Sequence, residues 1–251
     1  MDLRERVAAK KAELDNLRPL STRTLAELAR WYDVELTYSS NAVEGNTLTR
    51  NETILVLEQG LTVSGKPLRE HLEATGHRDA LLFVRELAAG AEPVREADVR
   101  NIHRLVMQRI DPDEAGRYSN HQRVITGSTL LLPSPAEIPA YMGDFARWLQ
   151  DAPRTPEAAF DAHERLVTIH PFSDGNGRTS RLLMNLLLLR AGYAPVVILL
   201  EDRLAYFNAL DAVRSGSPQA YYRFMAERLE TALDHYLRVL RKGLDLPPGD
   251  S

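Results

Sequence analysis

Residues 170–181 read HPFSDGNGRTSR, and these twelve positions hold a histidine, a carboxylate, two glycines and two arginines. Pro171 directly follows His170 and prevents a preceding helix from continuing, so we expect the imidazole at a helix end, where it can act as a general base. The Gly-Asn-Gly run at 175–177 can turn successive backbone N–H groups toward one concavity, because glycine readily adopts positive φ. A concavity of this kind binds anions.

Two arginines follow the glycines and one aspartate precedes them. Arg178 and Arg181 fall three residues apart in the first turn of the next expected helix, where the positive end of the helix dipole disfavours cations unless an anion compensates them. A bound polyphosphate is such an anion. Asp174 would repel that polyphosphate unless a hard cation joins the two, and Mg²⁺ is the natural bridge. The stretch therefore predicts a site for a nucleotide polyphosphate with a base beside it.

Spacing excludes two other metal sites. A zinc-protease helix needs a second histidine four residues after His163, and a valine stands there. A calcium loop that begins at Asp174 needs acids or amides at alternate positions and a glutamate near its end. Two of those ligand positions hold Arg178 and Ser180, and Asn185 stands where the glutamate belongs. A polar loop between two core helices would explain any one of the motif residues, but not the base, the concavity and the paired cations together.

The composition is that of a soluble globular chain. Its 251 residues, 44% of them hydrophobic, suffice for one large domain or two small ones. Lys and Arg total 31 against 35 Asp and Glu, and the net charge of −4 gives no bulk attraction to nucleic acid or to an anionic membrane, so we expect neither as a partner. The absence of cysteine excludes disulfides and thiolate sites. Residues 1–13 lack an apolar signal core, and we expect a cytoplasmic location.

Helical periodicity dominates the chain, and we expect a mainly α fold. The apolar run at 182–189 is too short to cross a bilayer and indicates a core helix that is buried on most sides. Residues 123–132 are the exception, because two β-prone runs there flank a Gly-Ser pair and predict a short hairpin. The expected helices are 3–17, 22–39, 53–57, 69–88, 96–109, 136–150, 158–169, 178–191, 203–213 and 218–240.

Residues 170–181 match the Fic family signature, H-[P/x]-F-x-[D/E]-G-N-G-R-x-x-R, at every defined position, and the chain resembles that family. The GRY sequence at 116–118, the expected hairpin and the LPSPAE sequence at 132–137 also look like the family's flap region and the helix start that follows it. The resemblance implies a Fic fold, a helical bundle with a short β-hairpin flap.

The resemblance covers roughly residues 92–228 and implies a division of the chain into three parts. We expect an N-terminal helical region at 1–91, a Fic core domain at 92–228, and a C-terminal helix end and tail at 229–251.

Most Fic proteins with the Gly-Asn-Gly form of the motif are similar to one another in transferring AMP from ATP to a hydroxyl group of a target protein. The resemblance therefore implies a nucleotidyltransferase, a protein adenylyltransferase that uses ATP and Mg²⁺. It implies that His170 deprotonates a Tyr, Ser or Thr hydroxyl and that Asp174 holds Mg²⁺ against the α- and β-phosphates. The remaining implied roles are a phosphate cradle at Gly175, Asn176 and Gly177, contacts to the β- and γ-phosphates from Arg178 and Arg181, and target docking by strand pairing at Thr126, Gly127 and Leu131.

Relatives that resemble the Doc toxin carry an altered Gly-Asn-Gly region and act as kinases, and Gly175 and Gly177 argue against that activity. In other relatives the last nucleotide-contacting helix ends in Ala-Asn-x-Gly, whereas residues 212–216 read AVRSG here, so the preference for adenine is less firmly implied than the phosphate chemistry. Tyr206 and Phe207 look like the family's aromatic pair near the base, and they fit core packing equally well.

Residues 39–46 read SSNAVEGN and resemble the [S/T]-x-x-x-E-[G/N] inhibitory motif of Fic proteins, with Ser40, Glu44 and Gly45 at the defined positions. The resemblance implies an inhibitory helix around 38–46 and a pair between Glu44 and Arg181, which would remove the guanidinium from the γ-phosphate of ATP. Taken alone, the same short pattern also fits an ordinary helix cap followed by an acid in the first turn.

Two other functions stay open at this stage. The same site would remove AMP from a modified target if Glu44 positions an attacking water. A nucleotide-binding regulatory module without turnover is the other alternative, and the intact His170 weighs against it. The resemblance also implies that the chain can form a homodimer.

Overall fold

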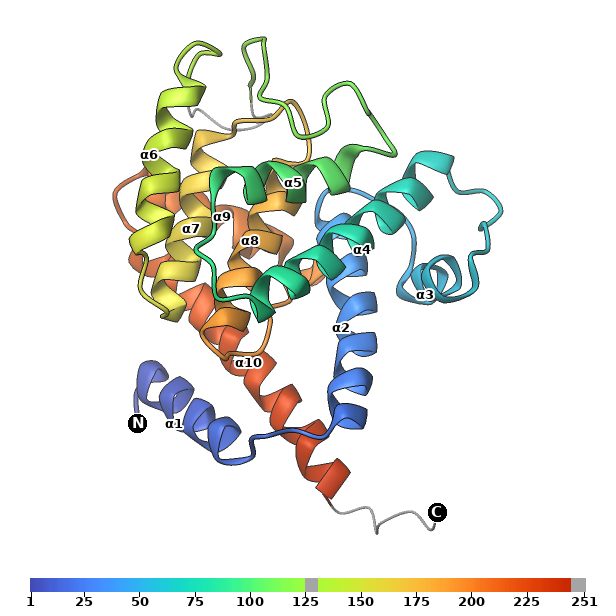
Figure 1. Cartoon of the computed structure of the whole chain (residues 1–251), viewed down its shortest axis with the longest axis vertical. Coiled ribbons are helices and arrows are strands. Elements are labelled where there is room, and N and C mark those ends of the chain that lie inside the picture. The colour runs from blue at the N-terminus through green and yellow to red at the C-terminus, as the bar shows by residue number, and fades with distance from the viewer. Residues whose placement is uncertain (125–130, 245–251) are drawn as a thin grey trace.

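The computed structural model describes residues 1–124 and 131–244, and within them the regular elements are helices (Figure 1). The mainly α fold is confirmed, and each expected helix is present with its ends within four residues of the predicted ones. The elements are α1 (Leu3–Asn16), α2 (Thr22–Val43), α3 (Arg50–Gln59), α4 (Leu68–Ala89), α5 (Glu96–Met107), α6 (Ile138–Asp151), α7 (Pro156–Ile169), α8 (Asn176–Arg190), the 3₁₀ turn η1 (Leu200–Asp202), α9 (Arg203–Arg214) and α10 (Gln219–Leu244).

The hairpin predicted at 123–132 centres on residues 125–130, which lie outside the described part of the chain. Thr126 and Gly127 fall within that segment. Leu131 is described, and its side chain is exposed. The flap and the division at residue 91 stay predictions.

Helix α8 lies at the centre of the bundle, with α4, α5 and α7 packed around it (Figure 1). Leu182, Leu183 and Leu186 on this helix are fully buried, which confirms the apolar run as a core element. Because α8 is surrounded on most sides, its first turn is held at a fixed place inside the molecule. The motif residues at its N-terminus are therefore attached to the most buried helix.

Helix α2 continues four residues beyond the predicted end and stops at Val43. Ser39, Ser40 and Asn41 have low helix propensity, but all three are buried, and tertiary packing overrides that weak local preference. The chain then turns at Gly45, whose φ of 103° is one that other residues rarely adopt. Ser40 therefore lies inside the last turn of a long helix, and Glu44 follows at its C-cap. The alternative in which Ser40 caps the start of a helix is wrong.

Of the helices in the described residues, none is both long enough and apolar enough to cross a membrane.

Candidate active site

His170 ends α7 in the left-handed conformation, with φ of 51°, and its N–H donates to Leu166 O at 3.0 Å. Its Nδ1 lies 3.2 Å from Val167 O, an acceptor only, so Nδ1 carries the proton and Nε2 keeps a lone pair. Burial lowers the pKa of His170, and the positive charge of Arg123 lowers it further. The imidazole is therefore neutral at pH 7, with Nε2 available to accept a proton.

The loop between α7 and α8 is held from inside by Asn176. Its Oδ1 accepts from the Phe172 N–H at 3.0 Å, and its Nδ2 donates to Phe172 O at 2.8 Å. The buried amide thus shapes the loop, and at the start of α8 only the backbone N–H of this residue remains to face an anion.

His103 of α5 holds the same loop from outside. Its Nδ1 accepts from the Gly116 N–H at 2.9 Å, so the proton sits on Nε2, which donates to Asp174 O at 2.9 Å. The ring also stacks on Phe172 with centroids 3.7 Å apart. Burial lowers the pKa of His103 to about 4, which keeps this tautomer neutral. The sequence did not indicate this role.

Glu44 lies against the first turn of α8. Gly175 is the N-cap, with φ of 74°, and a methyl group added at Gly177 would overlap the Glu44 carboxylate. Helix N-termini attract anions because their first N–H groups lack partners within the helix and carry the positive end of the dipole. Glu44 therefore lies where the sequence predicts phosphate binding.

Arg181 binds the end of α2 through three contacts. Its Nη2 lies 2.8 Å from Glu44 Oε1 and 2.8 Å from Ser40 O, and its Nε donates to Ser40 Oγ at 2.9 Å. The arginine is only 4% exposed. The two residues that the family resemblance pairs are thus in direct contact, and the Ser40 carbonyl is one of those that an α-helix leaves unpaired at its C-terminus.

Arg178 and Asp174 belong to a network of alternating charges with two residues of α4. Arg178 lies 3.7 Å from Glu73 Oε1 and 3.3 Å from Asp174 Oδ1. Arg69 contacts the same two acids, Asp174 Oδ2 at 2.8 Å and Glu73 Oε1 at 3.1 Å. Burial alone would raise the pKa of Asp174, but Arg178, the Gly175 N–H and Arg69 together lower it. The carboxylate stays ionised, and it is half exposed.

Asn46 joins this network to the turn that carries Glu44. Its Nδ2 donates to Glu73 Oε2 at 2.9 Å and to Glu70 O at 3.1 Å. Glu73 therefore contacts Arg178 on one side and the turn at 44–46 on the other.

Arg123 links His170 to the residues that flank the predicted flap. Its guanidinium donates to His170 O and, at 2.6 Å, to Pro133 O. The side chain is buried, although it carries a charge. The backbone of the expected base is thereby tied to the chain on both sides of residues 125–130.

The two aromatic residues that resemble a base-binding pair contact each other, with ring centroids 5.2 Å apart, but they lie in different surroundings. Tyr206 is buried, and its hydroxyl lies 2.8 Å from His163 Nε2. Phe207 is half-buried beneath the Arg203 guanidinium, 5.1 Å from the ring centroid. Tyr206 thus packs in the core behind Arg181. Arg214, at the position where relatives carry asparagine, pairs with Asp211 at 2.7 Å.

Comparisons with known proteins agree with this geometry. Residues 93–188 match the model of the Fic/DOC family. The structure of Fic-1 from C. elegans superposes with a TM-score of 0.82 at 34% identity, covering 94% of this chain and 70% of that one. A Fic domain containing signaling protein from Bacteroides thetaiotaomicron superposes with a TM-score of 0.88 at 27% identity over 97% of this chain and all of that one. The chain belongs to the Fic/DOC family, and the expected Fic fold is confirmed.

Curated relatives carry names that state an activity. The protein adenylyltransferase Fic of Nematostella vectensis is 40% identical over 80% of this chain and 48% of its own length. Protein adenylyltransferase fic-1 of Caenorhabditis elegans is 35% identical over 85% of this chain and 43% of its own. The chain thus spans less than half the length of these two relatives.

Replacing Asn176 with alanine tests the loop geometry. Asn176→Ala leaves a buried N–H and a buried carbonyl of Phe172 without partners, which we expect to lower the free energy of unfolding by about 2–4 kcal/mol. The exposed Asn51 gives the matched control, because Asn51→Ala should change the free energy of unfolding by no more than about 0.5 kcal/mol. Urea unfolding measures both, and equal values for the two variants would contradict the role given to Asn176.

Proposed function

We propose that the chain is a protein adenylyltransferase that transfers AMP from ATP to a Tyr, Ser or Thr hydroxyl of a target protein and is autoinhibited by Glu44. The observation that carries this proposal is the Glu44 carboxylate lying on the first turn of α8 and on Arg181, close to a neutral histidine. An anion site and a base beside it are what phosphoryl chemistry on a hydroxyl requires. The names of the curated relatives support the same activity.

In the proposed reaction His170 Nε2 takes the proton of the target hydroxyl, and the oxygen attacks the α-phosphorus of ATP in line. The bond between that phosphorus and the oxygen bridging to the β-phosphate breaks, and pyrophosphate leaves. The α8 N–H groups and the two arginines of the motif, Arg178 and Arg181, stabilise the negative charge on the departing group. His170 is prepared for its step because Nδ1 already donates to Val167 O.

Inhibition follows from competition for one place. Glu44 uses the Arg181 guanidinium and the start of α8, the groups that would otherwise bind phosphate. A carboxylate there also adds a negative charge where ATP needs positive potential. ATP can bind productively only after the turn at 44–46 moves away.

Asp174 suits the Mg²⁺ that accompanies ATP. It is ionised, 48% exposed, and held at the loop by the Gly175 N–H. Within residues 1–124 and 131–244 no three acids or histidines gather into a metal site, so the ion would be held jointly by Asp174 and the nucleotide phosphates. Bound there, Mg²⁺ would neutralise phosphate charge.

Removal of the Glu44 side chain tests autoinhibition. In Glu44→Gly the first turn of α8 and Arg181 become available to phosphate, so we expect self-modification with labelled ATP to rise at least tenfold over the native chain. His170→Ala in the same background should abolish labelling, because it removes the group that is proposed to take the proton. Label incorporation followed by mass spectrometry reports both. Labelling of Glu44→Gly no greater than that of the native chain would refute autoinhibition.

Arg69 gives a second test, because it occupies Asp174 Oδ2 in the structure and is itself 58% exposed. A cation that binds Asp174 must displace this guanidinium. In the Glu44→Gly background, Arg69→Gln should therefore lower several-fold the Mg²⁺ concentration needed for half-maximal binding of an ATP analogue with a methylene α–β bridge, measured by calorimetry.

The control for this test is Arg223→Gln, which removes an exposed arginine from α10. We expect it to leave the Mg²⁺ dependence unchanged. The same dependence in both variants would show that Arg69 does not compete for Asp174.

A further inference from the structure

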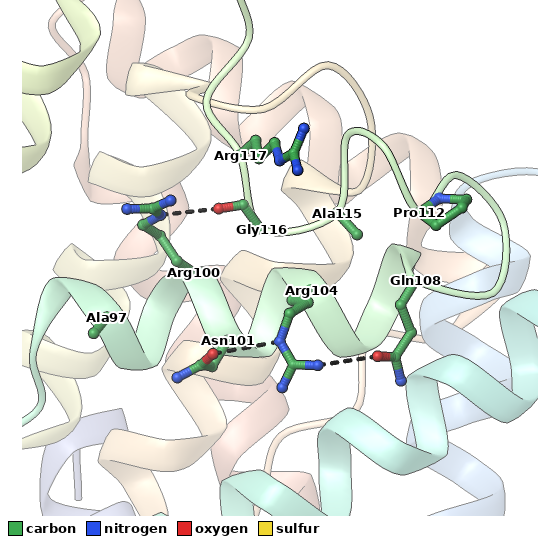
Figure 2. A pocket seen from close by; sticks show the side chains of 9 residues that line it. All are labelled: Ala97, Arg100, Asn101, Arg104, Gln108, Pro112, Ala115, Gly116 and Arg117. Carbon is green, nitrogen blue, oxygen red and sulfur yellow. Dashed lines mark hydrogen bonds between the residues drawn. The ribbon is translucent and has the colours of Figure 1, made fainter.

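A groove of about 630 Å³ lies between the outer face of α5 and the loop that follows it (Figure 2). Arg100, Arg104 and Arg117 line it, and no acidic residue does. All three arginines are exposed. This groove lies apart from the residues that hold Glu44 and His170, and the proposed reaction does not use it.

The arginines are oriented by neutral acceptors. Arg100 Nε donates to Gly116 O at 2.9 Å, and Arg104 Nη1 donates to Gln108 Oε1 at 3.1 Å (Figure 2). In the part of the chain that the structure describes, neither they nor Arg117 form an ion pair with an acid. Arg100 also lies over the Tyr118 ring, 5.2 Å from its centroid, and the remaining N–H groups of the two guanidiniums can bind an anion.

The spacing of the two helical arginines fits carboxylates on an extended peptide. Arg100 and Arg104 are four residues apart on α5, so their Cβ atoms lie on the same face of the helix, roughly 6 Å from each other. Alternate side chains of an extended chain recur on one side at about 6.6 Å. In the structure the two guanidiniums point apart, Arg100 toward Gly116 and Arg104 toward Gln108 (Figure 2), so a segment with acids at alternate positions reaches both once these exposed side chains turn toward it.

The surroundings favour a short acidic peptide over a nucleic acid. Asp111 and Asp113 are exposed on the loop beside the groove, and Glu114 there accepts from Ser173 Oγ at 2.7 Å. These acids and the net charge of −4 would repel a long, uniformly charged polyphosphate backbone. A short peptide with a few carboxylates can place them at the arginines of the groove without passing these acids.

Hydrogen bonds connect the wall of the groove to the proposed active site, although the two lie on opposite sides of α5. Gly116 forms part of the groove wall, and its N–H donates to His103 Nδ1. His103 Nε2 in turn donates to the Asp174 carbonyl. A few residues on, the Ser119 N–H donates to Pro171 O at 2.9 Å, so the chain leaving the groove runs along the motif toward the predicted flap.

We infer that this groove binds an acidic segment of the target protein, near the hydroxyl that receives AMP. The identity of the bound segment as part of a modified target rests on the proposed function. The binding itself requires neither ATP nor AMP transfer. It assigns a substrate class, proteins with acidic residues at alternate positions close to the acceptor.

Fluorescence anisotropy of the full chain with a fluorescein-labelled peptide of alternating Asp and Ala tests the inference without ATP. We expect binding that weakens as salt rises, and a loss of about tenfold or more in the Arg100→Gln, Arg104→Gln double variant. The double variant Arg147→Gln, Arg223→Gln removes the same charge from exposed sites elsewhere and should bind as the native chain does. A peptide with Asn in place of Asp should not bind.

Three results would overturn the inference. They are absence of peptide binding, equal losses in the two double variants, and tighter binding of a single-stranded oligonucleotide through the same arginines. If the groove variant unfolds by circular dichroism, Arg117→Glu replaces it, because that exposed side chain forms no ion pair whose loss would destabilise the fold. Labelling in the Glu44→Gly background is scored separately, so its failure counts against the transferase proposal and leaves the groove result intact.

Discussion

The contact between Glu44 and Arg181 joins two helix ends of opposite polarity. Glu44 follows the C-terminus of α2 and lies on the N-terminus of α8, while Arg181 from α8 binds the Ser40 carbonyl at the end of α2. Each helix end thus receives a charge of the sign that its dipole favours, supplied by the other helix. Because Arg181 is buried, its charge requires an anion, and within residues 1–124 and 131–244 Glu44 is the acid that pairs with it. Structural stability and the proposed control of the site depend on the same contact.

The rest of the site is arranged around that contact. Tyr206 and His163 fill the space behind Arg181, and burial together with the Arg181 charge lowers the pKa of His163 to about 3. On the other side Glu73 connects Arg178 to Asn46, so the turn that carries Glu44 is tied to the second arginine of the motif as well. Displacing Glu44 therefore means loosening the contacts of Asn46 and Ser40 too.

The sequence predicted the parts of this site that depend on local rules. Helix periodicity located α7 and α8, proline after His170 indicated a helix end, and the glycines at 175 and 177 marked the start of α8. The predicted end of α2 was wrong because burial stabilises the polar residues of its last turn, and helix propensity does not measure burial. His103, Glu73 and Arg123 were missed because their roles depend on backbone atoms brought close only by tertiary packing. The spacing of Arg69 and Glu73 indicates a surface ion pair on α4, but nothing in it points to Asp174.

The proposed autoinhibition requires that Glu44 and phosphate compete for the start of α8 and Arg181. Calorimetric titration with inorganic triphosphate, in the absence of divalent cations, tests it directly on the native chain, Glu44→Gln and Glu44→Gly. Glu44→Gln keeps the shape of the side chain and removes its charge, whereas Glu44→Gly removes both. We expect triphosphate to bind most weakly to the native chain, with intermediate affinity to Glu44→Gln and most tightly to Glu44→Gly. The two extremes should differ in affinity by about tenfold or more. Equal affinities for all three would contradict it.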